Sequence, residues 1–227
     1  VYCEKPLTLS ILEAQRCIQA ARQYERVVQT GSQQRSSVFG PFRKACELIR
    51  SGRIGKVKSV TVGVGGPSKW CDLPGEQMPP GLDWDMWCGP TEVVPFHNDL
   101  YTPRAQPGWI SFRPYSGGEM TNWGAHGVDQ IQWALGMSQT GPVELWPITP
   151  GPNGKVGMRY QNGTVVSYDL ERGPQGGGIF VGGEIAIQIV DQALTFLDEG
   201  AMRERRLPPA FRSGILEPAG GIADPGK

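Results

Sequence analysis

Helical and strand-like patterns alternate over the first 64 residues, and this alternation limits the fold more than any other feature of the sequence. Of the two helices predicted in this stretch, the second follows Pro41 and ends at Ser51–Gly52, because proline often opens helices and glycine ends them. Strands are predicted at about 26–30 and 56–64, which gives the order of an α/β chain. A first helix is predicted over about 8–24, where apolar residues recur at steps of four and three: Leu7, Ile11, Ala14, Ile18 and Ala21.

The second half of the chain carries the pattern of an antiparallel sheet. Asn162–Gly163, a strong signal for a tight turn, lies between strand patterns at 155–160 and 164–170. A further strand is predicted at 109–115 and a closing helix at 191–199. Residues 65–107, between the two halves, are rich in Pro, Gly and Trp, which favours a cover over a ligand or a contact between subunits.

The charge balance excludes some classes of partner. The 227 residues contain 22 Lys+Arg and 22 Asp+Glu, so no basic field attracts nucleic acid or anionic lipid. No apolar run approaches the roughly 18 residues of a membrane span. We therefore expect no nucleic-acid partner and no membrane partner.

The cysteines and histidines do not form a ligand cluster. There are five cysteines without a CxxC pair and two histidines, so we expect no metal site. Cys17 and Cys46 fall inside helical patterns and are predicted to be small buried thiols.

A polar stripe marks a third helix, predicted at about 122–135. Asn122, His126, Asp129 and Trp133 follow one another at steps of four, three and four and therefore share one face, while a roughly opposite face is apolar or small and packs. The stripe begins just after Gly117–Gly118, where a ligand can approach the backbone. His126 is a candidate acid or base; the alternative is a structural histidine bonded to Asp129 or to a backbone carbonyl.

Lys5 is the second candidate. Pro6 restricts Lys5 to extended geometry, so its ammonium is expected to project from the end of a strand, where α/β folds bind ligands. The alternative for a Lys beside Glu4 is a solvated ion pair.

Four strings, in order along the chain, resemble the Gfo/Idh/MocA oxidoreductase family. The strings are Glu4–Leu7, Gly31–Arg35, Gly52–Val57 and Gly117–His126, the last followed by Asp129. The resemblance implies an α+β (α/β) chain with a large, mostly antiparallel open sheet and helices on one face, preceded by the last helix and strand of a Rossmann domain. It divides the chain into a Rossmann remnant at 1–31, a substrate-binding and oligomerisation domain at 32–200, and an irregular tail at 201–227.

The resemblance also implies roles for single residues. Lys5 lies between nicotinamide and substrate, with Glu4 and Pro6 as further cofactor contacts, and His126 is the acid/base or a hydroxyl ligand. Asn122 stands where many members carry Asp, and an amide cannot accept a proton. The implied reaction oxidises a CH–OH group of a sugar, polyol or glycoside with NAD or NADP, in a homo-oligomer. Arg113, Tyr115, Trp109 and Asp129 are expected to bind substrate, although Trp109 is equally suited to core packing.

One family element is not found in this sequence. The strand, glycine-rich turn and helix that bind a dinucleotide do not occur, since Gly63–Ser68 follows a strand but ends in Pro-Ser. We expect the chain to be a fragment that binds dinucleotide weakly and turns over little by itself. A noncatalytic carbohydrate-binding or oligomerisation module and an NAD-dependent glycosidase or lyase are the alternatives. The compartment is cytoplasmic by default, or periplasmic if an export signal precedes the chain.

Overall fold

A seven-stranded sheet forms the centre of the computed structural model, which describes residues 1–36, 42–102, 108–113, 115–151, 155–168, 176–183, 185–190 and 193–197. The strand order is β11-β10-β9-β3-β8-β7-β6, and within it only β3 and β8 pair in parallel. The strands are β3 (Ser59–Val62), β6 (Glu144–Pro147), β7 (Val156–Arg159), β8 (Val165–Tyr168), β9 (Gly178–Val181), β10 (Ala186–Val190) and β11 (Ala193–Leu197). The mostly antiparallel sheet expected from the sequence is confirmed.

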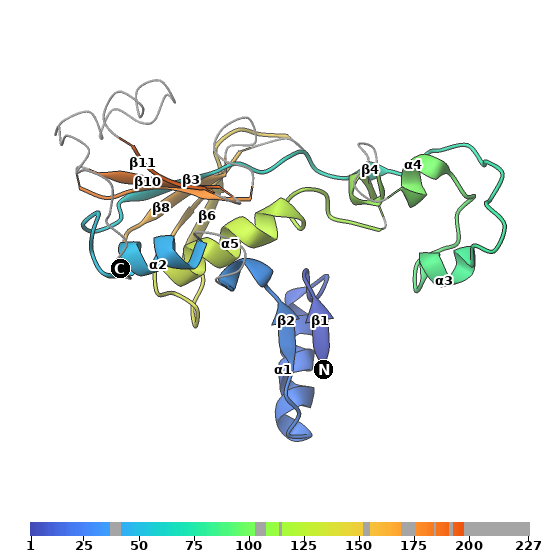
Figure 1. Ribbon diagram of the computed structural model, residues 1–227, viewed down its shortest axis with the longest axis horizontal. Helices are drawn as coiled ribbons and strands as arrows, with labels where there is room; N and C mark the ends of the chain where they lie inside the picture. The colour runs from blue at the N-terminus through green and yellow to red at the C-terminus, as the bar shows by residue number, and fades with distance from the viewer. Residues whose placement is uncertain are drawn as a thin grey trace, which may run out of the picture.

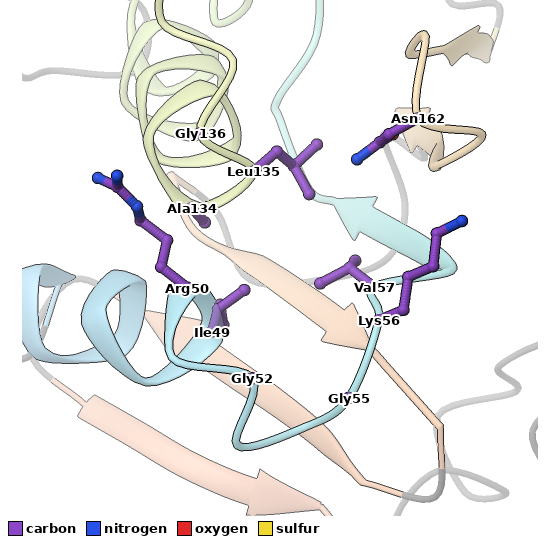
Figure 2. A pocket seen from close by; sticks show the side chains of 10 residues that line it. All are labelled: Ile49, Arg50, Gly52, Gly55, Lys56, Val57, Ala134, Leu135, Gly136 and Asn162. Carbon is purple, nitrogen blue, oxygen red and sulfur yellow. The ribbon is translucent and has the colours of Figure 1, made fainter.

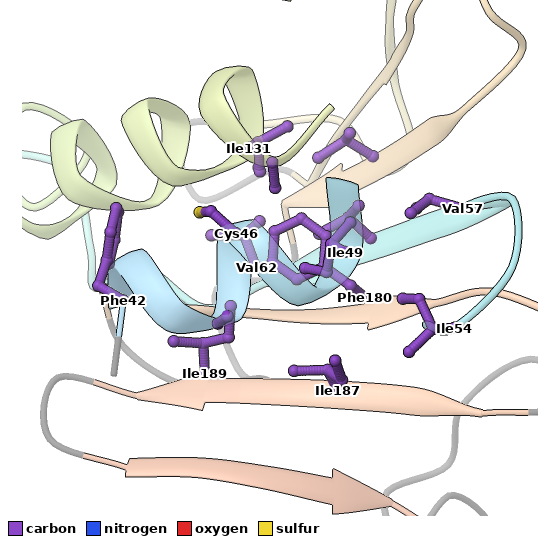
Figure 3. Close-up of a cluster of buried hydrophobic side chains, with 14 of the residues drawn as sticks. Phe42, Cys46, Ile49, Ile54, Val57, Val62, Ile131, Phe180, Ile187 and Ile189 are labelled. Atoms are coloured by element: carbon purple, nitrogen blue, oxygen red, sulfur yellow. The ribbon is translucent and has the colours of Figure 1, made fainter. Parts of the chain in front are cut away.

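Helices α2 (Phe42–Arg50) and α5 (Trp123–Ala134) cover one face of this sheet (Figure 1). The pairing register places Val60 between Val166 and Phe180, so alternate residues of neighbouring strands form one apolar surface. Figure 3 shows the helices packed on that surface. The core includes Phe42, Cys46, Ile49, Ile131, Val62, Phe180, Ile187 and Ile189, all buried.

Small residues let α5 lie close to the sheet. A Cβ atom at Gly127 would come within 2.9 Å of Val62 Cγ1, so glycine permits this approach. Gly124, Ile131 and Ala134 are buried on the same side of the helix. The predicted apolar face of this helix is thus confirmed: its other members, Val128 and Leu135, are half-buried and pack against the same core.

Residues 65–102, 108–113 and 115 belong to an arm that extends away from the sheet (Figure 1). Its elements are β4 (Lys69–Trp70), α3 (Trp84–Cys88), α4 (Asn98–Tyr101), η3 (Trp109–Ser111) and β5 (Phe112–Arg113). The arm has its own apolar cluster, in which Trp84 stacks on Trp87 and meets Phe96 edge to face. The strand predicted at 109–115 is only partly correct, because 109–111 is a 3-10 helix and 114 lies outside the described residues.

The first elements form a β-α-β unit in which β1 (Tyr2–Glu4) and β2 (Gln29–Gly31) pair in parallel around α1 (Ile11–Gln23). Ser10 caps α1 by accepting a hydrogen bond from the backbone N–H of Glu13. No residue of α1 is buried, so the expected packing of its apolar face is not seen, and Cys17 is exposed rather than buried. Two short strands offer too little surface to cover the helix.

The closing helix predicted at 191–199 is wrong. Residues 193–197 form β11, which pairs antiparallel with β10. Leu194 packs against the core beneath α2 and α5, whereas Leu197 is buried in a separate cluster with Val181 and Ala186. Residues three apart point to opposite faces of a strand, which accounts for this division. The predicted tail, 201–227, lies outside the described residues.

In the described ranges, no helix has the length and apolar character needed to cross a bilayer.

The hairpin predicted at Asn162–Gly163 is confirmed: it joins β7 to β8, and Gly163 has a φ of 87°. Only glycine adopts such a value readily.

Candidate functional site

Lys5 follows directly on the last residue of β1 and reaches the start of α5. Its Nζ donates hydrogen bonds to the backbone carbonyl of Asn122 at 2.9 Å and to the Asn122 side-chain Oδ1 at 3.0 Å. The position at a strand end agrees with the extended geometry that the sequence predicts. The fold thereby brings together two residues that are 117 positions apart in the sequence.

Asn122 is in turn held by Glu119. The side-chain Nδ2 of Asn122 donates to Glu119 Oε2 at 3.0 Å, so Lys5, Asn122 and Glu119 form one chain of polar contacts. Asn122 directly precedes the first residue of α5, and its side chain makes no capping bond to the helix. Each end of the amide is therefore bonded to a charged group, Oδ1 to the ammonium and Nδ2 to the carboxylate.

His126 lies one helical turn after Asn122 and is half-buried. The Gln34 Nε2 atom is 3.5 Å from His126 Nε2, and the Trp123 ring centroid lies 5.7 Å from that of His126. In the described part of the chain, Gln34 Oε1 is buried and has no hydrogen-bond partner. Lys5, Asn122 and His126, all predicted from the sequence, thus belong to one region at the N-terminal end of α5.

Glu119 and Gln34 are site residues that the sequence analysis did not assign. Both stand in strings that carry the family resemblance, Gly117–His126 and Gly31–Arg35. For Glu119 the available signal was a polar residue directly after Gly118, whereas Gln34 lies three positions after Gly31 and carried no such signal. The contact of Gln34 with His126 depends on tertiary structure, because 92 positions separate the two residues, whereas Glu119 and Asn122 are only three positions apart.

Burial and nearby charges have opposite effects on the pKa of Lys5. Partial burial lowers the pKa of Lys5 below its ordinary value, and the carboxylates of Glu119 and Glu4 oppose that change. An ammonium carries three N–H donors, and two of them are used on Asn122. Among the described residues these are the hydrogen bonds that Lys5 donates, so its third donor can bind a hydroxyl oxygen of a ligand.

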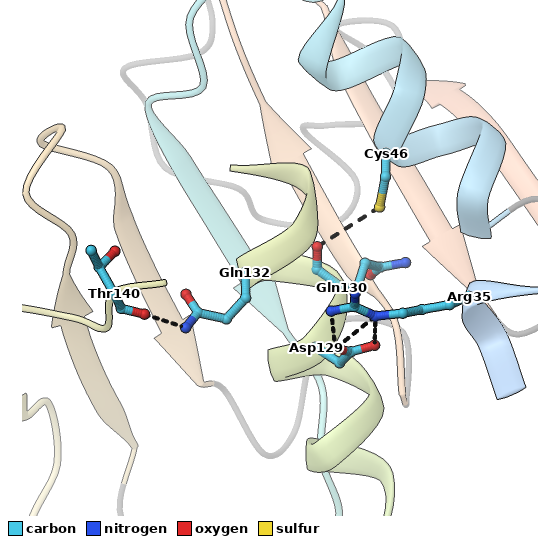
Figure 4. Close-up of polar contacts among 6 residues, drawn as sticks. All are labelled: Arg35, Cys46, Asp129, Gln130, Gln132 and Thr140. Atoms are coloured by element: carbon cyan, nitrogen blue, oxygen red, sulfur yellow. Dashed lines mark hydrogen bonds and ion pairs between the residues drawn. The ribbon is translucent and has the colours of Figure 1, made fainter. Parts of the chain in front are cut away.

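Asp129 is engaged in an ion pair (Figure 4). Arg35 Nε lies 2.9 Å from Asp129 Oδ2, and Arg35 Nη2 donates to Oδ1, which makes the contact bidentate. The guanidinium also lies over the Trp133 ring, 5.2 Å from its centroid. This pair fixes η1 (Gln33–Arg35) to α5, and a substrate contact of Asp129 stays a prediction.

Glu4 is likewise occupied by protein groups. Its carboxylate accepts hydrogen bonds from Gln33 Nε2 at 2.8 Å and from the Tyr2 hydroxyl at 3.0 Å. A Cβ atom at Gly31 would overlap this carboxylate, so glycine makes room for it. The cofactor contacts expected of Glu4 and Pro6 stay predictions.

Three further predicted residues lie in the arm. Tyr115 donates to the carbonyl of Glu92 and lies beside Cys88, and burial raises the pKa of Tyr115 to about 12. Arg113 lies over Trp70 and donates to Ser68, while Trp109 packs against the apolar cluster of the arm. The core-packing alternative thus fits Trp109, and the substrate roles of all three stay predictions.

The described residues do not form a complete dinucleotide site. The loop after β3, where Gly63–Ser68 lies, leads into β4 rather than into a helix. A Cβ atom at Gly65 would lie 2.5 Å from Glu119 Cγ, so a side chain occupies the space beside that glycine. A pyrophosphate cradle at a helix N-terminus is therefore not provided there. Among the residues described, no three His, Cys, Asp or Glu side chains gather as metal ligands would.

A separate cavity of about 490 Å³ lies where α2 and α5 end, beside the β7–β8 turn (Figure 2). Ile49, Val57 and Leu135 give it apolar walls, while Arg50 and Asn162 add polar groups. The predicted site residues do not line it.

Comparisons with known proteins agree with this architecture. The model of the Gfo/Idh/MocA oxidoreductase family, C-terminal alpha/beta domain, matches residues 43–170. Among solved structures, an NAD-binding protein from Listeria innocua has 15% sequence identity and a TM-score of 0.52, covering 90% of this chain and 51% of its own. An oxidoreductase from Thermotoga maritima has 18% identity and a TM-score of 0.51, covering 91% and 58%.

The WlbA dehydrogenase from Bordetella pertussis, solved in complex with NADH and UDP-GlcNAcA, is also similar. It has 19% identity and a TM-score of 0.50, covering 86% of this chain and 54% of its own. At such identities the likeness concerns the fold. The chain spans about half the length of these structures. No curated protein sequence matches it.

Proposed function

This chain belongs to the Gfo/Idh/MocA oxidoreductase family, and on that premise we propose that it carries the substrate-binding part of an enzyme that oxidises a CH–OH group of a sugar, polyol or glycoside. The observation that supports this proposal most is the fixed position of the Lys5 ammonium on Asn122, one turn before His126. A hydrogen-bond donor and a titratable ring are the two groups that removal of a hydroxyl proton requires.

Each residue then has a distinct task. The remaining N–H of Lys5 donates to the substrate oxygen and stabilises the negative charge that develops on it. A ring nitrogen of His126 accepts the hydroxyl proton, and Gln34 and Trp123 hold the ring in place. Arg113, Tyr115, Trp109 and Asp129 are proposed to bind the rest of the substrate.

Oxidation also needs a hydride acceptor, which we propose to be NAD or NADP in a longer form of the protein. Glu4, Lys5 and Pro6, at the end of β1, are its proposed contacts. The parallel β1–α1–β2 unit and its exposed apolar side chains support assigning 1–31 to the end of a Rossmann domain. We assign 32–200 to the substrate and oligomerisation domain, and 201–227 to a tail.

Copies of the chain are proposed to associate through the sheet face opposite α2 and α5. Light scattering of the purified chain tests this assignment, since a single copy has a mass of 24.7 kDa. A monomer at all accessible concentrations would contradict it.

Calorimetric titration of the 227-residue chain with sugars, polyols and glycosides tests the substrate assignment. We expect saturable binding of at least one compound, weakened about tenfold, or about 1.4 kcal/mol, by Lys5→Ala and by His126→Ala. Lys44→Ala, an exposed change on α2, is the matched control and should leave binding unchanged.

Turnover is measured separately by following reduced nicotinamide. We expect little turnover from this chain, and loss of turnover on His126→Ala in a form that includes a dinucleotide site. Unchanged binding and turnover in both site variants would contradict the proposed roles.

A further inference from the structure

We propose that Glu119 is the positioning residue of the Lys5–Asn122 pair: its carboxylate selects which end of the Asn122 amide faces the ammonium and provides the opposing negative charge. The inference deepens the proposed function, and its meaning for catalysis rests on that proposal. Three observations on the described residues support it: the direction of the hydrogen bonds, the partners of Lys5, and the packing of Glu119 against a glycine.

The hydrogen bonds permit only one orientation of the amide. With Oδ1 toward Lys5 Nζ at 3.0 Å and Nδ2 toward Glu119 Oε2 at 3.0 Å, each donor meets an acceptor. Rotating the amide by half a turn would place NH₂ against NH₃⁺ and oxygen against carboxylate, and both contacts would be repulsive. Without Glu119, only the ammonium would distinguish the two ends of the amide. The carboxylate therefore makes Asn122 a fixed acceptor.

Glu119 also balances the charge of Lys5. In the described part of the chain, Lys5 donates to the neutral oxygens of Asn122 rather than to a carboxylate. Glu4 is the other carboxylate that acts on Lys5, but it also accepts hydrogen bonds from Tyr2 and Gln33. Partial burial disfavours the ammonium, and of the two carboxylates that oppose this effect Glu119 has the larger influence on the pKa of Lys5.

The loop after β3 holds Glu119 in place. The Glu119 backbone N–H donates to the Gly66 carbonyl at 3.1 Å, and a Cβ atom at Gly65 would lie only 2.5 Å from the Glu119 Cγ atom. Pro67 also forms a β-bridge with Gly118, next to Glu119. The Gly63–Ser68 string, which is unsuited to a phosphate, thus has a structural purpose: it brings two loops close enough to seat this side chain.

The test is an NMR titration of Lys5 in the 227-residue chain, with ¹³C at the lysine Cε and the signal assigned by Lys5→Arg. We expect Glu119→Gln, which keeps the size and an acceptor oxygen, to lower the pKa of Lys5 relative to the unaltered chain. Gly65→Ala, which leaves Glu119 in the sequence but displaces it, should change the pKa of Lys5 in the same direction. Glu47→Gln, an exposed change on α2, is the control and should have no effect.

An unchanged Lys5 pKa in folded Glu119→Gln, or in Gly65→Ala if the former does not fold, would overturn the inference. Circular dichroism of each variant identifies those that fold. The titration uses neither substrate nor cofactor, so its result is independent of the proposed dehydrogenase activity. If no substrate binds but Glu119→Gln lowers the pKa of Lys5, only the proposed function is contradicted. If a substrate binds but the pKa of Lys5 is unchanged in Glu119→Gln, only the role of Glu119 is contradicted.

Discussion

Arg35 and Asp129 show that the tertiary partner of a side chain determines its hydrogen bonds. The polar stripe of the third helix placed Asp129 beside His126, and in the structure both of its carboxylate oxygens bind Arg35. Cys17 and Cys46 occupy similar helical patterns, yet only Cys46 is buried, and burial raises the pKa of its thiol to about 12. Helical spacing cannot distinguish the two cysteines, because the packing partner decides.

The Arg35–Asp129 pair should contribute measurably to stability. In a double-mutant cycle with Arg35→Gln and Asp129→Asn, we expect a coupling free energy of about 1 kcal/mol, since the contact is bidentate and partly shielded. The measurement is urea unfolding of the four chains. The Arg43–Glu47 pair, whose side chains are 57% and 58% exposed, is the control and should couple by no more than about 0.5 kcal/mol. Equal coupling in the two pairs would contradict the expectation.

Close backbone approach determines how β9 meets the loop before β3. Gly182, just after β9, is buried, and a Cβ atom there would overlap the carbonyl oxygen of Ile54. The next residue, Gly183, donates its N–H to that same carbonyl at 2.9 Å but has open space where its Cβ would be. Two adjacent glycines therefore have different reasons to be glycine.

These two glycines make a matched pair of variants. Gly182→Ala should lower the free energy of unfolding by about 2 kcal/mol or more, because a backbone atom must move. Gly183→Ala should change it by no more than about 0.5 kcal/mol. Thermal and urea unfolding measure both values. If the two alanine variants unfold alike, the backbone contact at Ile54 does not form in solution.

Across the whole molecule, polar groups buried in the sheet domain make stability depend on pH. Burial, together with Tyr160, raises the pKa of Tyr168 well above 10.0, its value in an unfolded chain. The folded state thus keeps a proton that the unfolded state loses, so stability falls as pH rises above about 10. In the described part of the chain, the Tyr168 hydroxyl is buried without a hydrogen-bond partner.

Tyr168→Phe should therefore reduce this alkaline loss. Near neutral pH we expect the variant to be as stable as the unaltered chain, or more stable by up to about 1 kcal/mol, since it removes an unpaired buried hydroxyl. Urea unfolding between about pH 8 and about pH 11 should show a shallower decline for the variant. Tyr24→Phe, at an exposed position, is the control. Parallel declines in all three chains would show that Tyr168 does not titrate on unfolding.

Local patterns in the sequence determined much of this protein. The three main helices, the Asn162–Gly163 hairpin, the antiparallel sheet and the position of Lys5 at a strand end all follow from residue spacing, proline and glycine. Such signals act over a few residues, and the sequence carries them directly.

Only the tertiary structure decided the rest. It made residues 193–197 an edge strand, because pairing with β10 outweighed a helical pattern. It also brought Gln34 to His126 and Lys5 to Asn122, and it placed Trp109 and Tyr115 in the arm. The Gln34–His126 and Lys5–Asn122 contacts join residues 92 and 117 positions apart in the chain, so their formation depends on how the folded elements pack and not on the local pattern of either partner.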